Sequence, residues 1–243
     1  MPDDSNKTDL PAASGKAAVE EFLAKVAAVP SAKPGGRRGR LIFAMDATAS
    51  REPAWDRACH IQAEMFEATR ALGGLDVQLV FYRGFRECKA SPFVSDADEL
   101  RRRMTAVRCL AGHTQIGRVL SHAAKEHRRQ RVDALVFVGD AFEEDIDKVG
   151  HRAGELGLAG VPAFLFHEGG DPVAGRAFQQ VAKLTGGACC PFDLSSADQL
   201  KALLGAVAVY AAGGHAALER YGADRGGEAL RLTRQMGRQE GGR

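Results

Sequence analysis

The chain has 243 residues, of which 45% are hydrophobic and 26% are charged, and its formal net charge is only +2. This composition is typical of a globular protein that buries a sizeable core, and the low charge argues against nucleic acid or an anionic membrane as a partner. The most apolar stretch, 203–212, is too short to span a bilayer, and the first residues lack the apolar core of a signal peptide. We therefore expect a cytoplasmic protein.

The cysteines also favour a reducing compartment. There are five, an odd number, and their spacing does not match a zinc site. We expect reduced thiols with mostly structural roles, and the pattern does not decide whether the adjacent pair has a redox role. The residues are Cys59, Cys88, Cys109, Cys189 and Cys190.

Three segments divide the chain. Residues 1–38 are predicted to form a polar arm with a short amphipathic helix at 17–28 and a basic linker, because apolar residues recur there at helical spacing before two prolines. The arm could dock on the domain or serve a partner. Residues 39–221 are predicted to form the folded domain, and 222–243, rich in Gly and Arg, a flexible tail.

Within 39–221, short apolar runs alternate with amphipathic segments. The runs carry few polar interruptions, which indicates strands buried on both faces of a sheet. The predicted strands are 41–45, 77–81, 87–94 (a weaker edge strand), 134–138, 162–167 and 189–192. The predicted helices are 53–72, 95–104, 116–131, 146–156, 173–184 and 198–212. This alternation predicts an α/β fold: a doubly wound, mostly parallel sheet of about six strands with helices on both faces, in a Rossmann-like three-layer sandwich.

The first strand ends in a cluster of oxygen-bearing side chains. Asp46 follows the apolar run, and Thr48 and Ser50 follow at every second position. Carboxylate and hydroxyl oxygens suit a hard cation such as Mg²⁺. The alternative is structural, because either hydroxyl could cap the helix that follows.

Two further residues could join this cluster. Asp140 ends another buried strand, and Thr114 opens a helix after a loop. If the two strands are neighbours at the point where strand order reverses, both carboxylates lie over one crevice. For Thr114, too, simple capping of the helix is the alternative.

These three segments resemble the motifs of the von Willebrand factor A (vWA) family. Asp46-Ala47-Thr48-Ala49-Ser50 is similar to its first motif, Gly112-His113-Thr114-Gln115-Ile116-Gly117 to its threonine loop, and Val138-Gly139-Asp140 to its last motif. The similarity covers about 39–212. Thr48 stands where serine is usual, Gly139 where threonine is usual, and Ala141 where glycine is usual.

The resemblance implies a metal-ion-dependent adhesion site (MIDAS) with Mg²⁺ or Mn²⁺ as cofactor. Its ligands would be Asp46, Thr48, Ser50, Thr114 and Asp140, and an acidic residue of a partner protein would complete the octahedron. Stand-alone bacterial proteins of this kind often act beside AAA-type ATPases, which makes such an association an expectation here. A metal-free domain of the same fold is the alternative.

Other polar residues near the motifs are weaker candidates. His113 and Glu143 could contact a ligand, although a loop histidine and an acidic helix start are more often structural. Arginine-rich segments at 101–103 and 127–131 could contact phosphates, but they fall on predicted helix surfaces without interleaved aromatic residues.

Three functions compete on this evidence. We favour a non-enzymatic, metal-dependent protein-interaction module, because the motifs include no nucleophile or general base. A Mg²⁺-dependent phosphoester hydrolase is the first alternative, although the second acid that a phosphoaspartyl enzyme would carry two residues after Asp46 is replaced by Thr48. A nucleic-acid-binding protein that uses the arginine segments is the second.

Overall fold

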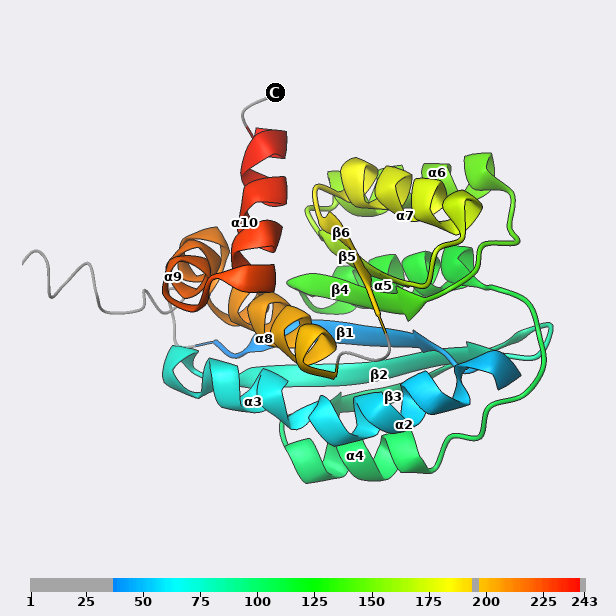
Figure 1. Cartoon of the computed structure of the whole chain (residues 1–243), viewed down its shortest axis with the longest axis horizontal. Helices are drawn as coiled ribbons and strands as arrows, with labels where there is room; N and C mark the ends of the chain where they lie inside the picture. Colours follow the sequence, from blue (N-terminus) through cyan, green and yellow to red (C-terminus); the bar gives the residue numbers. More distant parts are fainter. Residues whose placement is uncertain (1–36, 194–196, 241–243) are drawn as a thin grey trace, which may run out of the picture. The chain divides into compact units, whose positions relative to one another are not determined.

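A six-stranded sheet forms the centre of the domain in the computed structural model, which describes residues 37–193 and 197–240 (Figure 1). The predicted helix at 17–28 lies outside the described residues. The strands are β1 (Gly39–Asp46), β2 (Leu75–Arg83), β3 (Glu87–Val94), β4 (Ala134–Gly139), β5 (Ala163–Glu168) and β6 (Ala188–Phe192). Each predicted strand is confirmed to within a few residues.

The order of the strands determines where the ends of β1 and β4 meet. They lie in the order β3-β2-β1-β4-β5-β6, and only the edge strand β3 runs antiparallel to its neighbour. The chain winds outward from β1 to β3, then returns to the other side of β1 and winds outward from β4 to β6. The switch point is therefore between β1 and β4, and a crevice forms outside the carboxyl ends of these two strands.

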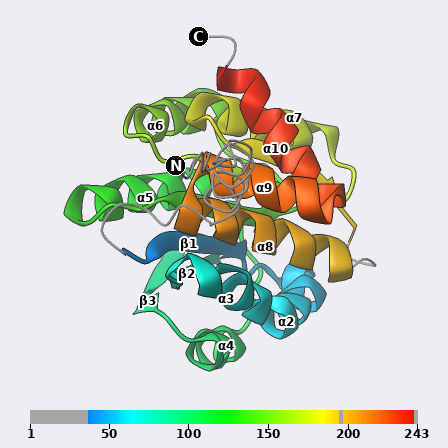
Figure 2. The same cartoon turned by 90° about the vertical axis from the view of Figure 1, so that its left-hand side faces the viewer.

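Helices cover both faces of the sheet, as predicted (Figures 1 and 2). One face is covered by α5 (Ile116–Arg129), α6 (Ile146–Leu158) and α7 (Pro172–Thr185). The other is covered by α2 (Glu52–Ile61), α3 (Ala63–Thr69), α4 (Ala97–Thr105), α8 (Ala197–Gly213), α9 (His215–Arg225) and α10 (Gly227–Glu240). Strand β1 supplies both cores, since Leu41, Phe43 and Met45 point into one and Ile42 and Ala44 into the other. The helix predicted over 53–72 is divided into α2, α3 and a short 3₁₀ turn, Arg70–Leu72.

The end of the basic linker anchors β1. The Arg37 guanidinium pairs with Asp133 at 2.9 Å, and the Arg38 guanidinium pairs with Asp76 at 2.7 Å. Both partners lie at the amino ends of the strands beside β1. These ion pairs, together with the backbone hydrogen bonds to the neighbouring strands, explain why β1 begins at Gly39 and not at Leu41, where the predicted strand begins.

The predicted flexible tail at 222–243 is wrong for residues 227–240, which form helix α10. Ala229, Leu232 and Met236 are buried in the core cluster that also includes residues of β6. Gln235 accepts a hydrogen bond from the backbone N–H of Cys189 at 3.0 Å. The three apolar residues recur at helical spacing among polar and glycine residues, and only their docking on the domain makes this helix stable.

We predict that Leu232→Ala lowers the free energy of unfolding by about 3 kcal/mol, because it removes a fully buried side chain and leaves a cavity. Leu158→Ala is the matched control, since Leu158 is 93% exposed at the end of α6 and its truncation should change stability by less than about 0.5 kcal/mol. Urea denaturation measures both values. Equal effects in the two variants would show that α10 is not part of the core.

Two remaining expectations concern thiols and membranes. None of the five cysteines forms a disulfide in this structure, and their reduced state stays a prediction. Within the part of the chain that the structure describes, no helix combines the length and the apolar character that a bilayer crossing needs.

Candidate metal centre

Asp46 is the last residue of β1 and lies at the switch point. Its side chain is 1% exposed, and its Oδ1 accepts a hydrogen bond from the backbone N–H of Thr48 at 2.7 Å. Burial raises the pKa of Asp46, hydrogen bonding to Thr48 opposes this rise, and the negative charge of Asp140 adds to it. No ion pair of Asp46 is found among the described residues. A cation beside this buried carboxylate would favour its charged form.

The hydroxyls of Thr48 and Ser50 follow Asp46 and are not used as helix caps. Thr48 precedes the 3₁₀ turn η1 (Ala49–Arg51), yet its side chain makes no capping hydrogen bond, and α2 also begins without a side-chain cap. The two hydroxyl oxygens lie 3.5 Å from each other. The capping alternative for these two residues is therefore wrong, and both oxygens remain available to a ligand.

Thr114 is held beside the loop that follows β4. Its Oγ1 accepts a hydrogen bond from the backbone N–H of Glu143 at 2.9 Å, and its own N–H donates to the Glu143 carboxylate at 3.1 Å. Thr114 is only 5% exposed. Its hydroxyl keeps a free lone pair and its proton, so the residue can still offer an oxygen to a cation.

The amino end of α5 is capped by Glu144 rather than by Thr114. The Glu144 carboxylate accepts hydrogen bonds from the backbone N–H groups of Ile116 and Gly117, the latter at 3.1 Å. Gln115, the residue before the helix, makes no side-chain cap of its own. The capping alternative for Thr114 is therefore wrong. Of the acidic residues after Asp140, Asp145 and Asp147 do form a solvated helix start: Asp145 caps α6, and Asp147 lies exposed in its first turn.

Asp140 follows β4, on the other side of the switch point from Asp46. Because β1 and β4 pair in parallel, the two aspartates emerge side by side from the same edge of the sheet. Gly139 replaces the family's usual threonine, and its place is explained by packing: a Cβ there would lie 2.8 Å from the Phe137 ring.

The five predicted ligands meet in one pocket of about 290 Å³, which they line together with Glu143. His113 is not among the lining residues. The donor set consists only of carboxylate and hydroxyl oxygens, which fits Mg²⁺ or Mn²⁺. In residues 37–193 and 197–240, no group of three or more His, Cys, Asp and Glu side chains is arranged to hold a metal. Any metal here would depend on the hydroxyl oxygens.

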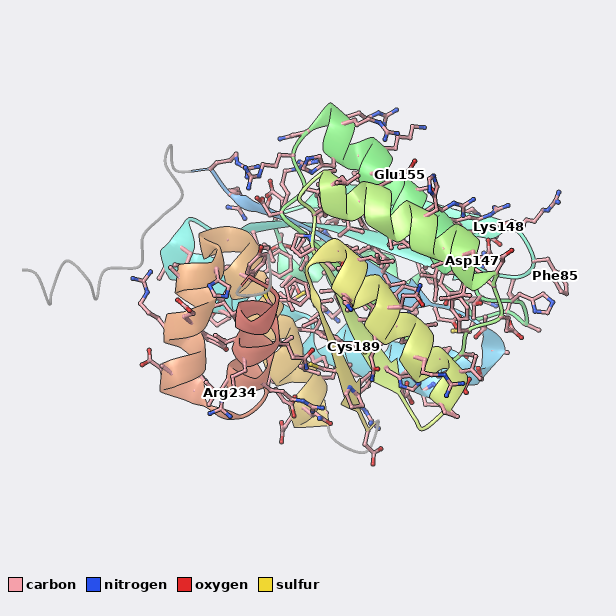
Figure 3. The ribbon with its side chains drawn as sticks, turned by 90° about the horizontal axis from the view of Figure 1, so that it is seen from above. Phe85, Asp147, Lys148, Glu155, Cys189 and Arg234 are labelled. Atoms are coloured by element: carbon pink, nitrogen blue, oxygen red, sulfur yellow. The ribbon has the colours of Figure 1, made fainter. Side chains whose placement is uncertain are left out.

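His113 lies at the rim of this pocket. Its Nδ1 is 3.1 Å from Oε2 of Glu143, and its ring packs edge-on against Phe85, with 5.2 Å between centroids. Phe85 is 74% exposed at the turn between β2 and β3 and projects outward at the end of the domain where Asp147 lies in the first turn of α6 (Figure 3). His113 thus orients the rim and does not enter the pocket.

Sequence reasoning missed two charged residues behind the pocket. Arg51 is 1% exposed, and its guanidinium pairs with Glu168 and lies 3.5 Å from Oδ2 of Asp140. Glu168 is the last residue of β5 and is 8% exposed. A signal was present for Glu168, because it is a third acid at the end of a buried strand. For Arg51 there was none, since an arginine after two hydroxyl residues is typical of a surface.

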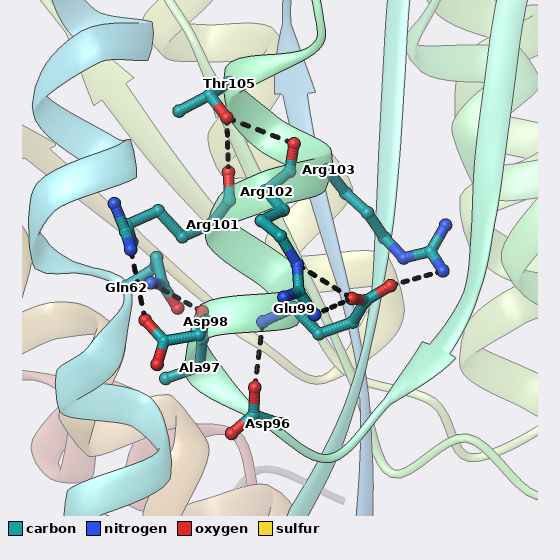
Figure 4. Close-up of polar contacts among 9 residues, drawn as sticks. All are labelled: Gln62, Asp96, Ala97, Asp98, Glu99, Arg101, Arg102, Arg103 and Thr105. Atoms are coloured by element: carbon teal, nitrogen blue, oxygen red, sulfur yellow. Dashed lines mark hydrogen bonds and ion pairs between the residues drawn. The ribbon is translucent and has the colours of Figure 1, made fainter.

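The arginine-rich segments are largely paired with acids. Arg101 pairs with Asp98, and Arg102 and Arg103 both pair with Glu99 on the surface of α4 (Figure 4). In the second segment, Arg129 pairs with Glu126 and Arg131 with Asp133. These pairs reduce the positive charge that phosphates would meet, which weakens the nucleic-acid alternative.

The fold was compared with solved structures. The SpRpn10 VWA domain aligns with a TM-score of 0.54 and 13% identity over 68% of this chain and 95% of that one. The vWF domain of the type V pili tip protein Mfa5 from Porphyromonas gingivalis aligns with a TM-score of 0.54 and 11% identity over 70% and 94%. PTMP1 from the mussel byssus, in a structure with a zinc-occupied MIDAS motif, aligns with a TM-score of 0.52 and 16% identity over 70% of this chain and 45% of its own. No protein-family model and no curated protein matches the sequence.

The doubly wound sheet has its oxygen-lined pocket at the switch point, which is where open α/β sheets commonly carry their ligand sites. Among open α/β folds, the domain has the von Willebrand factor A fold. The resemblance predicted from three short motifs is thereby confirmed at the level of the fold. That the five pocket residues bind a metal stays a prediction.

Proposed function

We propose that the protein is a metal-dependent protein-interaction module. A divalent cation, Mg²⁺ or Mn²⁺, would be held by Asp46, Asp140 and the hydroxyls of Thr48, Ser50 and Thr114. The cation would supply an open coordination position to an Asp or Glu side chain of a partner protein. The chain's own residues orient the ligands: the Thr48 N–H fixes one Asp46 oxygen, and Glu143 holds Thr114 in place.

One observation carries this proposal. The hydroxyl-bearing residues face a single pocket with the two aspartates, and none of the three side chains caps a helix. A purely structural role would use these hydroxyls for the backbone amides that follow them. Hydroxyls that line one pocket together with two carboxylates, and that cap no helix, support a ligand at this place.

A role as an interaction module does not require a catalytic group, and we propose none. The hydrolase alternative predicts turnover of a phosphoester substrate such as p-nitrophenyl phosphate in Mg²⁺, which the interaction module would not show. An AAA-type ATPase as partner stays a prediction from the resemblance. Co-purification from native lysate in Mg²⁺ and in chelator tests it, and a partner kept equally in both would contradict a metal bridge.

Thr114→Val tests the role of the hydroxyl. We expect the affinity for Mn²⁺, measured by calorimetry, to fall about tenfold because one oxygen ligand is lost, while stability falls by only about 1 kcal/mol from the lost hydrogen bond with Glu143. Thr105→Val is the control, since this exposed hydroxyl donates to carbonyls of its own helix, those of Arg101 and Arg102. If both variants bind Mn²⁺ like the native protein, Thr114 is not a ligand.

A further inference from the structure

Arg51 has an unusual position for an arginine beside a cation site. It ends the turn that carries Thr48 and Ser50, and it is one of the largest fully buried side chains of the described residues. Burying a guanidinium is costly unless carboxylates and hydrogen bonds compensate it. Packing alone therefore does not explain why the Arg51 side chain is buried.

The compensation comes from the ends of two neighbouring strands. Nη1 of Arg51 pairs with Glu168, which ends β5, and lies 3.5 Å from Oδ2 of Asp140, which follows β4. A single guanidinium nitrogen, Nη1, thus lies within ion-pair distance of two carboxylates. The contact with Asp140 is the longer one, and Asp140 also lines the pocket.

The pairing of Arg51 is incomplete. Its Nε and Nη2 are buried and have no hydrogen-bond partner among the residues that the structure describes. The guanidinium therefore has unused hydrogen-bond donors beside the Asp140 carboxylate, to which a cation would also bind. Burial is the main cause that raises the pKa of Glu168, and the charge of Arg51 opposes this rise.

We propose that Arg51 is a built-in counter-cation of the site, which balances Asp140 when no divalent ion is bound and competes with that ion for the Asp140 carboxylate. The ion pair with Glu168 keeps the guanidinium away from Asp140. It thereby determines how available the Asp140 carboxylate is to a metal ion. The stability of the fold would then not depend on a bound metal, and the competition would lower the affinity of the site for the metal. This inference rests on the proposed function, because it assigns Asp140 to the cation.

Two variants separate competition from a merely structural role. Glu168→Gln removes the group that restrains Arg51, so the guanidinium moves to Asp140 and the Mn²⁺ affinity falls about tenfold. Arg51→Met combined with Glu168→Gln removes the competitor without leaving an unpaired buried carboxylate at 168, and the Mn²⁺ affinity rises about tenfold. The control is Arg57→Met: Arg57 influences Glu168 through its charge but has no ion pair with Asp140 among the described residues. The Mn²⁺ affinity of Arg57→Met should differ from that of the native protein by less than about threefold.

A second readout does not depend on the affinity. With Arg51→Met alone, we expect the melting temperature in chelator to fall, because Glu168 and Asp140 lose their cation, and saturating Mn²⁺ should raise it by more than it raises that of the native protein. A purely structural arginine predicts the same Mn²⁺-induced increase in both proteins.

The outcomes are distinct. Opposite changes of affinity in the single and double variants support the inference. Changes in the same direction, or none, in a native protein that binds Mn²⁺ overturn it and leave the proposed function standing. If the native protein does not bind Mn²⁺ but the double variant does, Arg51 takes the place of the metal: the counter-cation role is supported and the proposed function fails. If neither binds, both are overturned.

Discussion

Asp46→Asn is expected to abolish divalent-cation binding while the domain stays folded. The asparagine oxygen can still accept the hydrogen bond from the Thr48 N–H, so the turn after β1 keeps its geometry. The negative charge that would face the cation is lost. Because even an outer-shell partner contributes about 10- to 100-fold to metal affinity, we expect a decrease of at least about 100-fold for a direct ligand.

Calorimetry with Mn²⁺ measures this loss, and circular dichroism with thermal melting checks the fold. Asp147→Asn is the matched control, because Asp147 is an exposed carboxylate in the first turn of α6 (Figure 3). It should bind Mn²⁺ like the native protein. An unchanged affinity in Asp46→Asn would contradict the site, whatever the control does.

Gly112→Ala is expected to have the second large effect, because Gly112 lies against the backbone of Gly84. A Cβ at 112 would be 2.2 Å from the Gly84 carbonyl oxygen, and no flexible side chain is available to move away. The loop would have to shift, although His113 N–H also bonds to that oxygen at 3.2 Å. Since Thr114 is two residues further along, we expect at least a tenfold loss of Mn²⁺ affinity, the size of a displaced ligand or ligand support.

Gly84→Ala is the control from the same contact. Gly84 has a φ of +59°, and a Cβ there would meet nothing within 4 Å, so the cost is backbone strain of about 1 kcal/mol without displacement of the loop. Stability should fall in both variants, but metal affinity only in Gly112→Ala. Equal affinities would show that the position of this loop does not matter to the site.

The local pattern of the chain determined the elements and the chemistry at their ends. Apolar runs such as 41–45 and 134–138 cannot be exposed, so they predict buried strands wherever they lie in the fold. The motif residues could be found for a similar reason, since Asp46, Thr48 and Ser50 are close in sequence and emerge together from one strand end. The six-stranded doubly wound sheet followed from the order of these elements.

Which distant residues meet is a property of the assembled fold. The pairing of β1 with β4 brings Asp46 to Asp140, and no local spacing encodes that neighbour. Helix α10 depends on apolar contacts with the rest of the domain, so its own composition indicated a loose tail. Arg51 is the clearest case: an arginine is normally exposed, and it is buried here only because two acids from the ends of separate strands compensate its charge. Burial and ion pairing are properties of the assembled fold, whereas periodicity and strand-end chemistry are properties of the chain itself.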